Sequence, residues 1–236
     1  MPSLSSSNIA NNLAQIQQNI LEFCDKYHRQ PQTVRLLAVS KTQSAEKIRT
    51  AFNAGQSCFG ENYLQEALQK ISDLDDLPIE WHFIGAIQSN KTRELAENFA
   101  WVHSVDRLKI ARRLSQQRPS TLAPLNICLQ VNISNESSKS GFNALDIGAG
   151  VDEIILLPNL KLRGLMAIPA PATHLTEQRT TFAKMHKLLK PLQTKYPQLD
   201  TLSMGMSGDM QAAIAEGSTI VRIGTAIFGA RKPSAL

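Results

Sequence analysis

The sequence of 236 residues lacks the long apolar runs of membrane spans and the paired cysteines of secreted domains. No stretch approaches the roughly 18 apolar residues of a transmembrane helix. The serine- and asparagine-rich start has neither the basic nor the apolar part of a secretory signal. The three cysteines, Cys24, Cys58 and Cys128, are far apart and odd in number, which predicts neither disulfides nor a zinc site. We therefore expect a cytoplasmic protein with no membrane partner.

A concentrated basic surface is also missing. Lysine and arginine exceed aspartate and glutamate by only 25 to 20, for a formal net charge of +5 and a pI near 9.2. The densest basic cluster, between Arg107 and Arg118, has the spacing of a solvated helical face. The five histidines lack the spacing of metal ligands. These patterns argue against a nucleic-acid partner and a metal centre, whereas the modest positive charge suits a small phosphorylated ligand.

Strand-like and helix-like segments alternate along the whole chain. Apolar residues at helical spacing predict an amphipathic helix over about residues 8–28. A helix over 176–196 should kink or end at Pro191, because proline cannot donate to the helical ladder. Strands are expected at 34–39, 58–60, 80–85, 101–104, 125–133, 160–168, 201–204 and 220–223.

The number of strands decides between two α/β folds. About eight strand–helix units in a chain near the roughly 250 residues of a (β/α)8 barrel predict a TIM barrel. An open doubly wound sheet is the alternative, but the glycine-rich turn expected after its first strand is absent. Since no change in composition marks a linker, residues 1–236 should form a single-domain α/β barrel.

The first strand ends abruptly on Lys41. A lysine held there loses hydration, its pKa falls, and the free amine can form a Schiff base with an aldehyde. A solvated lysine is the simpler interpretation of this residue by itself, because lysines are mostly exposed. The decision therefore depends on what surrounds Lys41 in the fold.

Two later strand ends carry glycine and hydroxyl groups suited to an anion. Ser207 lies in the loop after the seventh expected strand, and Gly224 and Thr225 follow the eighth. In a barrel these two loops are a frequent phosphate site, and the eighth strand closes against the first. Each loop can also be an ordinary helix cap. A lysine amine beside a phosphate site suits pyridoxal 5′-phosphate, which has both an aldehyde and a phosphate.

Arg222 in the last strand adds a third feature. Arginine stays protonated, so an arginine that donates to the pyridine nitrogen keeps that nitrogen unprotonated and the cofactor a poor electron sink. A surface ion pair is an equally good interpretation from the sequence alone.

Six segments, in order along nearly the whole chain, resemble one known family, the pyridoxal phosphate homeostasis proteins of the YggS-like kind. The resemblance implies a single-domain barrel similar to the N-terminal domain of alanine racemase. The segments are Ala38–Thr42, Phe59–Tyr63, His82–Gly85 with Gln88–Lys91, Gly164–Ile168, Leu202–Ser207 and Val221–Gly229.

The resemblance also implies roles for individual residues. Lys41 matches the Schiff-base lysine and Arg222 the partner of the ring nitrogen. One departure is Gly208, a candidate binding residue at a position before Asp209 where the family is expected to carry an acidic residue. Lys139 matches a second lysine that would help to retain or hand over the cofactor. The other implied cofactor-binding residues are Asn62, His82, Ser207, Gly224 and Thr225.

The resemblance implies a protein that binds pyridoxal 5′-phosphate and buffers it or delivers it to PLP-dependent apoenzymes, with no established turnover. Because the additional domain of the racemases is not expected here, we expect a monomer. The alternative is a racemase with weak activity, whose second proton carrier in alanine racemase is a tyrosine from an additional domain across a dimer interface. Here Tyr27, Tyr63 and Tyr196 are the only tyrosines, and Tyr63 could approach the barrel rim. A further alternative is an aldolase that forms a Schiff base with its substrate and uses no cofactor. It would give Arg222 and the two phosphate loops no common role unless the substrate is itself phosphorylated.

Overall fold

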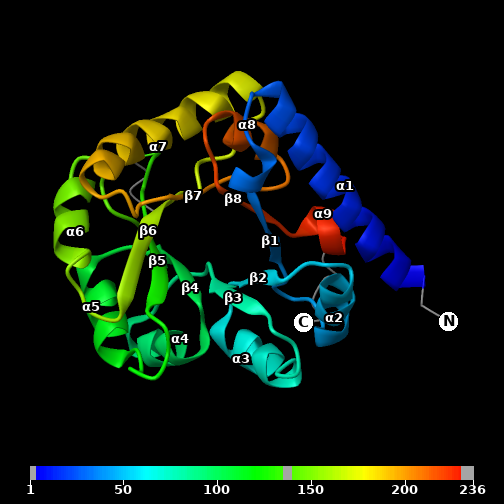
Figure 1. Ribbon diagram of the computed structural model, residues 1–236, viewed down its shortest axis with the longest axis horizontal. Coiled ribbons are helices and arrows are strands. Elements are labelled where there is room, and N and C mark those ends of the chain that lie inside the picture. The colour runs from blue at the N-terminus through cyan, green and yellow to red at the C-terminus, as the bar shows by residue number, and fades with distance from the viewer. Residues whose placement is uncertain (1–3, 135–139, 230–236) are drawn as a thin grey trace.

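Eight short strands close into one parallel barrel in the computed structural model, which describes residues 4–134 and 140–229 (Figure 1). Each strand pairs with the next along the chain, and β8 pairs with β1. The predicted single-domain (β/α)8 barrel is therefore confirmed. The strands are β1 (Arg35–Val39), β2 (Cys58–Glu61), β3 (Glu80–Phe83), β4 (Trp101–Val105), β5 (Leu125–Gln130), β6 (Leu160–Met166), β7 (Thr201–Ser203) and β8 (Ile220–Ile223).

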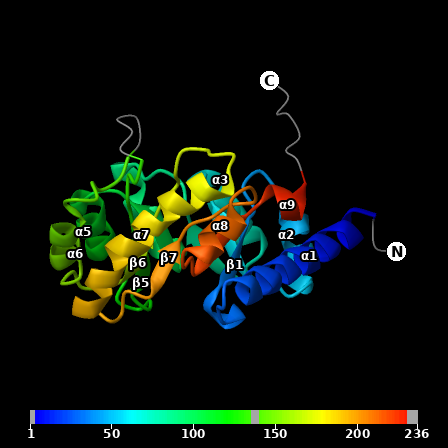
Figure 2. The same ribbon diagram turned by 90° about the horizontal axis from the view of Figure 1, so that it is seen from above.

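Helices surround the barrel and bury the outer faces of the strands (Figure 1). The first helix lies beside α2, α8 and α9, as both views show (Figure 2). Asn12 fastens it by donating to the carbonyl of Ile227 at 2.9 Å. The helices are α1 (Leu4–Lys26), α2 (Ala45–Asn53), α3 (Leu64–Asp73), α4 (Thr92–Asn98), α5 (Leu108–Gln117), α6 (Ile147–Ile154), α7 (Leu175–Lys195), α8 (Met210–Ala215) and α9 (Thr225–Phe228), with 3-10 turns η1 (Pro31–Thr33) and η2 (Ser89–Lys91).

The prediction that the helix ends at Pro191 is wrong, because α7 continues through this residue to Lys195. The alternative, a kink at Pro191, stays a prediction. Proline removes one donor, which leaves the carbonyl of Lys187 without its helical partner. Both residues are exposed, so water can take the place of the missing bond. The helix packs through Phe182, Met185 and Leu189 on its other face. Among the described helices, none is long and apolar enough to cross a membrane.

Alternation along the strands separates two apolar groups. In β1, Leu36 and Ala38 belong to the large core under the helices, whereas Leu37 belongs to a smaller group inside the barrel. Successive strand residues point to opposite faces. By the same alternation, polar side chains flanked by outward apolar residues point into the barrel, and these are His82, His103, Ser203 and Arg222.

Candidate functional site

The carboxyl ends of parallel strands meet at one rim of a barrel. Lys41 and Asn62 follow β1 and β2, which pair with each other. Because β8 pairs with both β1 and β7, the segments after β7 and β8 lie at the same part of the rim. The structure thus brings together Lys41, Asn62, Ser207, Gly208, Gly224 and Thr225, with Arg222 just below them in β8. Lys139 lies outside the described residues.

The end of β8 approaches the end of β1 closely. A Cβ atom added to Gly224 would lie 3.0 Å from the carbonyl oxygen of Val39 and 3.3 Å from its Cβ. Val39 ends β1, two residues before Lys41. Gly205 has a φ of 96°, and a Cβ there would lie 2.4 Å from the Cβ of Ala213. Gly224 therefore lets the segment after β8 approach the end of β1 beside the Lys41 turn, whereas Gly205 lets the loop after β7 pack closely against α8.

Two hydrogen bonds between Asp209 and Met206 close the loop after β7. The carboxylate of Asp209 accepts from the backbone N–H of Met206 at 2.5 Å, and the N–H of Asp209 donates to the Met206 carbonyl at 3.2 Å. Burial raises the pKa of Asp209, and the Met206 N–H and nearby Arg222 oppose that rise. Ser207 and Gly208 are left exposed at the tip. A Cβ at Gly208 would meet nothing within 4 Å, so no clash with the protein explains glycine at this position.

Arg222 is 4% exposed and points into the barrel below the rim. Its Nη1 donates to the Ser203 hydroxyl at 2.9 Å, and its Nη2 donates to the Ala167 carbonyl at 3.0 Å. Burial lowers the pKa of its guanidinium to about 10, with Asp209 opposing, so the group stays charged at neutral pH. Within residues 4–134 and 140–229 these two bonds use two of its five N–H donors, which leaves donors for a ligand.

Arg222 is the upper end of a chain of buried hydrogen bonds. Ser203 Oγ lies 2.7 Å from His103 Nδ1, and His103 Nε2 lies 2.8 Å from His82 Nδ1. His82 Nε2 lies 2.9 Å from Glu80 Oε1 near the opposite end of the barrel. The structure places His82 inside the barrel, where hydrogen bonds through His103 and Ser203 connect it to Arg222. Its place in the cofactor pocket stays a prediction.

The charge of Glu80 fixes the direction of every donor in this chain. The hydrogen bond from His82, together with Arg35, holds the pKa of Glu80 at about 2, so the carboxylate is ionised and accepts. His82 therefore donates from Nε2 and accepts at Nδ1 from His103. In turn His103 accepts from the Ser203 hydroxyl, because burial lowers the pKa of both imidazoles and keeps them neutral. Sequence reasoning missed His103 and Ser203; their polar character within apolar strands was the available signal.

The rim residues fit a group such as pyridoxal 5′-phosphate. Besides an amine, a guanidinium and two glycine loops, the rim has an amide oxygen, Asn62 Oδ1, that is buried without a hydrogen-bond partner in the described residues. A Cβ at Gly85 would overlap the Asn62 carbonyl oxygen, so the segment just after β3 lies directly against Asn62. A cavity of about 350 Å³ lies beside Asn62 and extends to Gln130 at the end of β5 and to Asn132 just after it.

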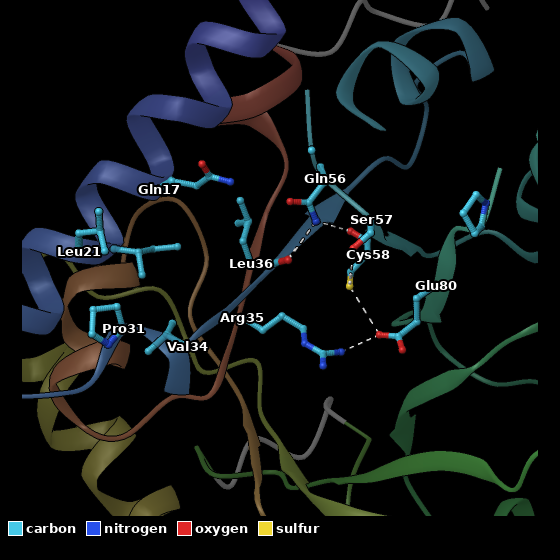
Figure 3. A pocket seen from close by; sticks show the side chains of 13 residues that line it. Gln17, Leu21, Pro31, Val34, Arg35, Leu36, Gln56, Ser57, Cys58 and Glu80 are labelled. Atoms are coloured by element: carbon cyan, nitrogen blue, oxygen red, sulfur yellow. Dashed lines mark hydrogen bonds and ion pairs between the residues drawn. The ribbon is translucent and has the colours of Figure 1, made fainter. Parts of the chain in front are cut away.

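A larger cavity, of about 660 Å³, lies at the amino-terminal ends of the strands, against α1. Figure 3 shows Arg35 and Cys58 both directed at Glu80. Donor atoms of Cys58, Glu80 and His82 lie within 4.8 Å of one another, which is close enough for a metal ion. The Arg35 guanidinium, however, lies 2.6 Å from Glu80 and already supplies the positive charge there. Of the sequence-predicted binding residues that the structure describes, none lines this cavity.

Comparison with known proteins gives the same family along the whole chain. The family model described as the alanine racemase N-terminal domain matches residues 11–232. A pyridoxal phosphate homeostasis protein of Pseudomonas aeruginosa is 59% identical over 225 residues, which cover 95% of this chain and 96% of the relative. The protein of the same name in Escherichia coli K12 is 51% identical over 228 residues, covering 95% and 97%.

Solved structures add the fold and one bound state. PipY of Synechococcus elongatus, solved with PLP bound, is 38% identical, with a TM-score of 0.82 over 94% of this chain and all of PipY. An alanine racemase of Clostridium difficile shares the fold at 13% identity and a TM-score of 0.72, over 97% of this chain and 58% of the racemase. This chain therefore belongs to the family of the pyridoxal phosphate homeostasis proteins, within the proteins that match the alanine racemase N-terminal domain.

Proposed function

We propose that this protein binds pyridoxal 5′-phosphate at the carboxyl-terminal rim of its barrel, as a Schiff base with Lys41, and buffers or delivers the cofactor. The observation that carries the proposal is the convergence of the Lys41 turn, the loops after β7 and β8, and Arg222 at one point of the rim. PipY, solved with PLP bound, supports the choice of ligand. When bound, the cofactor supplies a reactive aldehyde that an amine captures reversibly.

Each rim residue then has a defined task. The backbone N–H groups of Gly208, Gly224 and Thr225, with the hydroxyls of Ser207 and Thr225, bind the phosphate. Arg222 donates to the ring nitrogen and, because it stays protonated, keeps that nitrogen unprotonated. The Asn62 amide, whose Oδ1 has no partner in the described residues, faces the ligand. An unprotonated ring withdraws electrons poorly, which suits storage of the cofactor better than turnover.

We further propose that the protein acts as a cytoplasmic monomer without enzymatic turnover and that PLP-dependent apoenzymes receive its cofactor. The names of the relatives describe homeostasis proteins, although the fold is shared with racemases. Racemisation needs a second proton carrier. Of the three tyrosines, Tyr63 is the candidate for such a carrier, because it directly follows the rim residue Asn62 and is 54% exposed. Lys139 remains a predicted aid to retention, tested by the release rate of the cofactor from Lys139→Ala.

The test is a titration with pyridoxal 5′-phosphate followed by visible absorption. We expect a Schiff-base band in the wild type and in Lys161→Ala, a control at an exposed lysine at the other end of the barrel, and no band in Lys41→Ala. An alanine-racemisation assay on the same wild-type sample should show no turnover. A band with turnover would identify a racemase, and no band in the wild type would refute the cofactor site.

A further inference from the structure

A buried lysine lies directly behind the Lys41 turn. Lys70 in α3 is 5% exposed, whereas lysines are almost never buried without partners. Its Nζ donates to three oxygens: the Ser40 carbonyl and Glu61 Oε1, both at 2.8 Å, and Glu66 Oε1 at 2.5 Å. An ammonium has three N–H donors, so these contacts use all of them.

The two carboxylates also contact the Lys41 turn. Glu61 accepts from the Ser40 hydroxyl at 2.6 Å, and Glu66 accepts from the backbone N–H of Thr42 at 2.6 Å. The residues on both sides of Lys41 are therefore held by the same three side chains, through one carbonyl, one hydroxyl and one amide. We call Glu61, Glu66 and Lys70 the clamp.

The clamp holds a backbone conformation that the chain would not choose by itself. Thr42 has a φ of 63°, and positive φ is rare for a β-branched residue. In that conformation its N–H is directed at Glu66. Without this bond we expect φ to return to negative values, which would turn the peptide after Lys41 and move the side chain.

Stability alone does not explain why the clamp consists of charged residues. Glu61 is fully buried, burial raises the pKa of its carboxyl while Lys70 opposes the rise, and its Oε2 has no hydrogen-bond partner among the described residues. Buried ions lose hydration that their attraction barely repays, so an apolar cluster of the same size would stabilise at least as well. Such a network instead fixes the geometry of the backbone around Lys41, because each of its N–H and O–H donors has a defined acceptor.

We propose that Glu61, Glu66 and Lys70 are positioning residues that hold the Lys41 amine at the place where the aldehyde of the cofactor arrives. The inference rests on the proposed function. With Ser40 and Thr42 fixed, Lys41 has only its side-chain torsions to order when it bonds to the ligand. Positioning of a reacting group on fixed supports is a large part of its reactivity. The three residues come from one short run of the chain, Glu61 to Lys70, at the end of β2 and in α3.

Two ligands separate positioning of Lys41 from general support of the site. Pyridoxal 5′-phosphate uses the lysine, the ring contacts and the phosphate loops. Pyridoxine 5′-phosphate has the same ring and phosphate but an alcohol in place of the aldehyde, so it cannot bond to the lysine. A clamp that positions Lys41 should matter for the first ligand alone.

The experiment measures the affinity of both ligands and the rate at which the Schiff-base band appears, in Glu66→Ala, Glu66→Gln and Lys70→Met. Glu66→Ala and Lys70→Met should weaken pyridoxal 5′-phosphate binding and slow the band by roughly tenfold or more, the size expected for a misplaced reacting group. Pyridoxine 5′-phosphate should bind each variant within about twofold of the wild type. Glu66→Gln keeps an acceptor for Thr42 and should recover most of the rate.

Controls keep the outcomes distinct. Lys195→Met removes a surface ion pair with Asp152 far from the clamp and should change neither ligand. If Lys70→Met unfolds because Glu61 is left uncompensated, the double variant Glu61→Gln/Lys70→Met replaces it. Equal losses for both ligands, or none, would overturn the positioning role. A wild type with no Schiff-base band would instead refute the proposed function.

Discussion

Replacement of Ser203 by alanine should damage both stability and cofactor binding, because this hydroxyl joins two buried groups. It accepts from Arg222 at 2.9 Å and donates to His103 at 2.7 Å, and all three residues are 4% exposed or less. Alanine leaves one arginine N–H and one imidazole nitrogen without a partner. At about 1–3 kcal/mol for each unsatisfied buried group, the free energy of unfolding should fall by about 2–6 kcal/mol.

For a domain of this size each kcal/mol moves Tm by about 2–4 °C, so Ser203→Ala should melt at least about 4 °C below the wild type. The matched control is Ser57→Ala, an exposed serine whose hydroxyl makes, in the part of the chain that the structure describes, only a long contact with the Cys58 thiol. Calorimetry gives Tm, and a titration gives the affinity for pyridoxal 5′-phosphate, which should weaken because Arg222 keeps only its bond to Ala167. A Tm within 1 °C of the control would refute the buried hydrogen bonds that connect Arg222, Ser203 and His103.

Three other predictions concern pH, close approach and thiols. Because burial lowers the pKa of His82 and His103, the unfolded chain binds protons that the folded chain does not once the pH falls below about 6.5. Stability should therefore decrease from pH 6.5 towards 5 in urea titrations, and His103→Gln should flatten that slope; a flat wild-type profile would contradict this. Gly224→Ala should destabilise by about 1–3 kcal/mol through its contact with Val39. Gly148→Ala, with open space in α6, should instead stabilise by about 0.5–1 kcal/mol; equal effects would show that the contact with Val39 is irrelevant. Cys24 and Cys128 are fully buried, and burial raises the pKa of Cys128 to about 12. Neither should react with a thiol reagent before unfolding, and rapid labelling of either would show that the core opens.

The strands and most helices were predictable because each depends on a local pattern. That β8 lies beside β1 then follows from barrel closure, which is why Lys41 and Gly224 could be placed at one rim from the sequence. That α7 does not end at Pro191 has an equally local cause, because the carbonyl that loses its helical partner is on an exposed residue and can bond to water.

What the sequence could not show are partnerships across the barrel interior and behind the rim. In the sequence, nothing distinguishes Lys70 from an ordinary solvated lysine on a helix. Its burial becomes apparent only from its contacts with Ser40 and Glu61 in the structure. His103 and Ser203 are 100 residues apart, and nothing local in either strand pairs them. Such contacts depend on which strands face each other across the closed barrel. They can therefore be assigned only once the three-dimensional fold is known.

The most direct test of the central claim is to identify the lysine that holds the cofactor. Wild-type protein loaded with pyridoxal 5′-phosphate would be reduced with borohydride, digested and mapped by mass spectrometry. We predict one modified residue per chain, at Lys41. Modification at another lysine, or a protein that binds the cofactor but gives no reduced adduct, would contradict the Lys41 Schiff base and the rim site built around it.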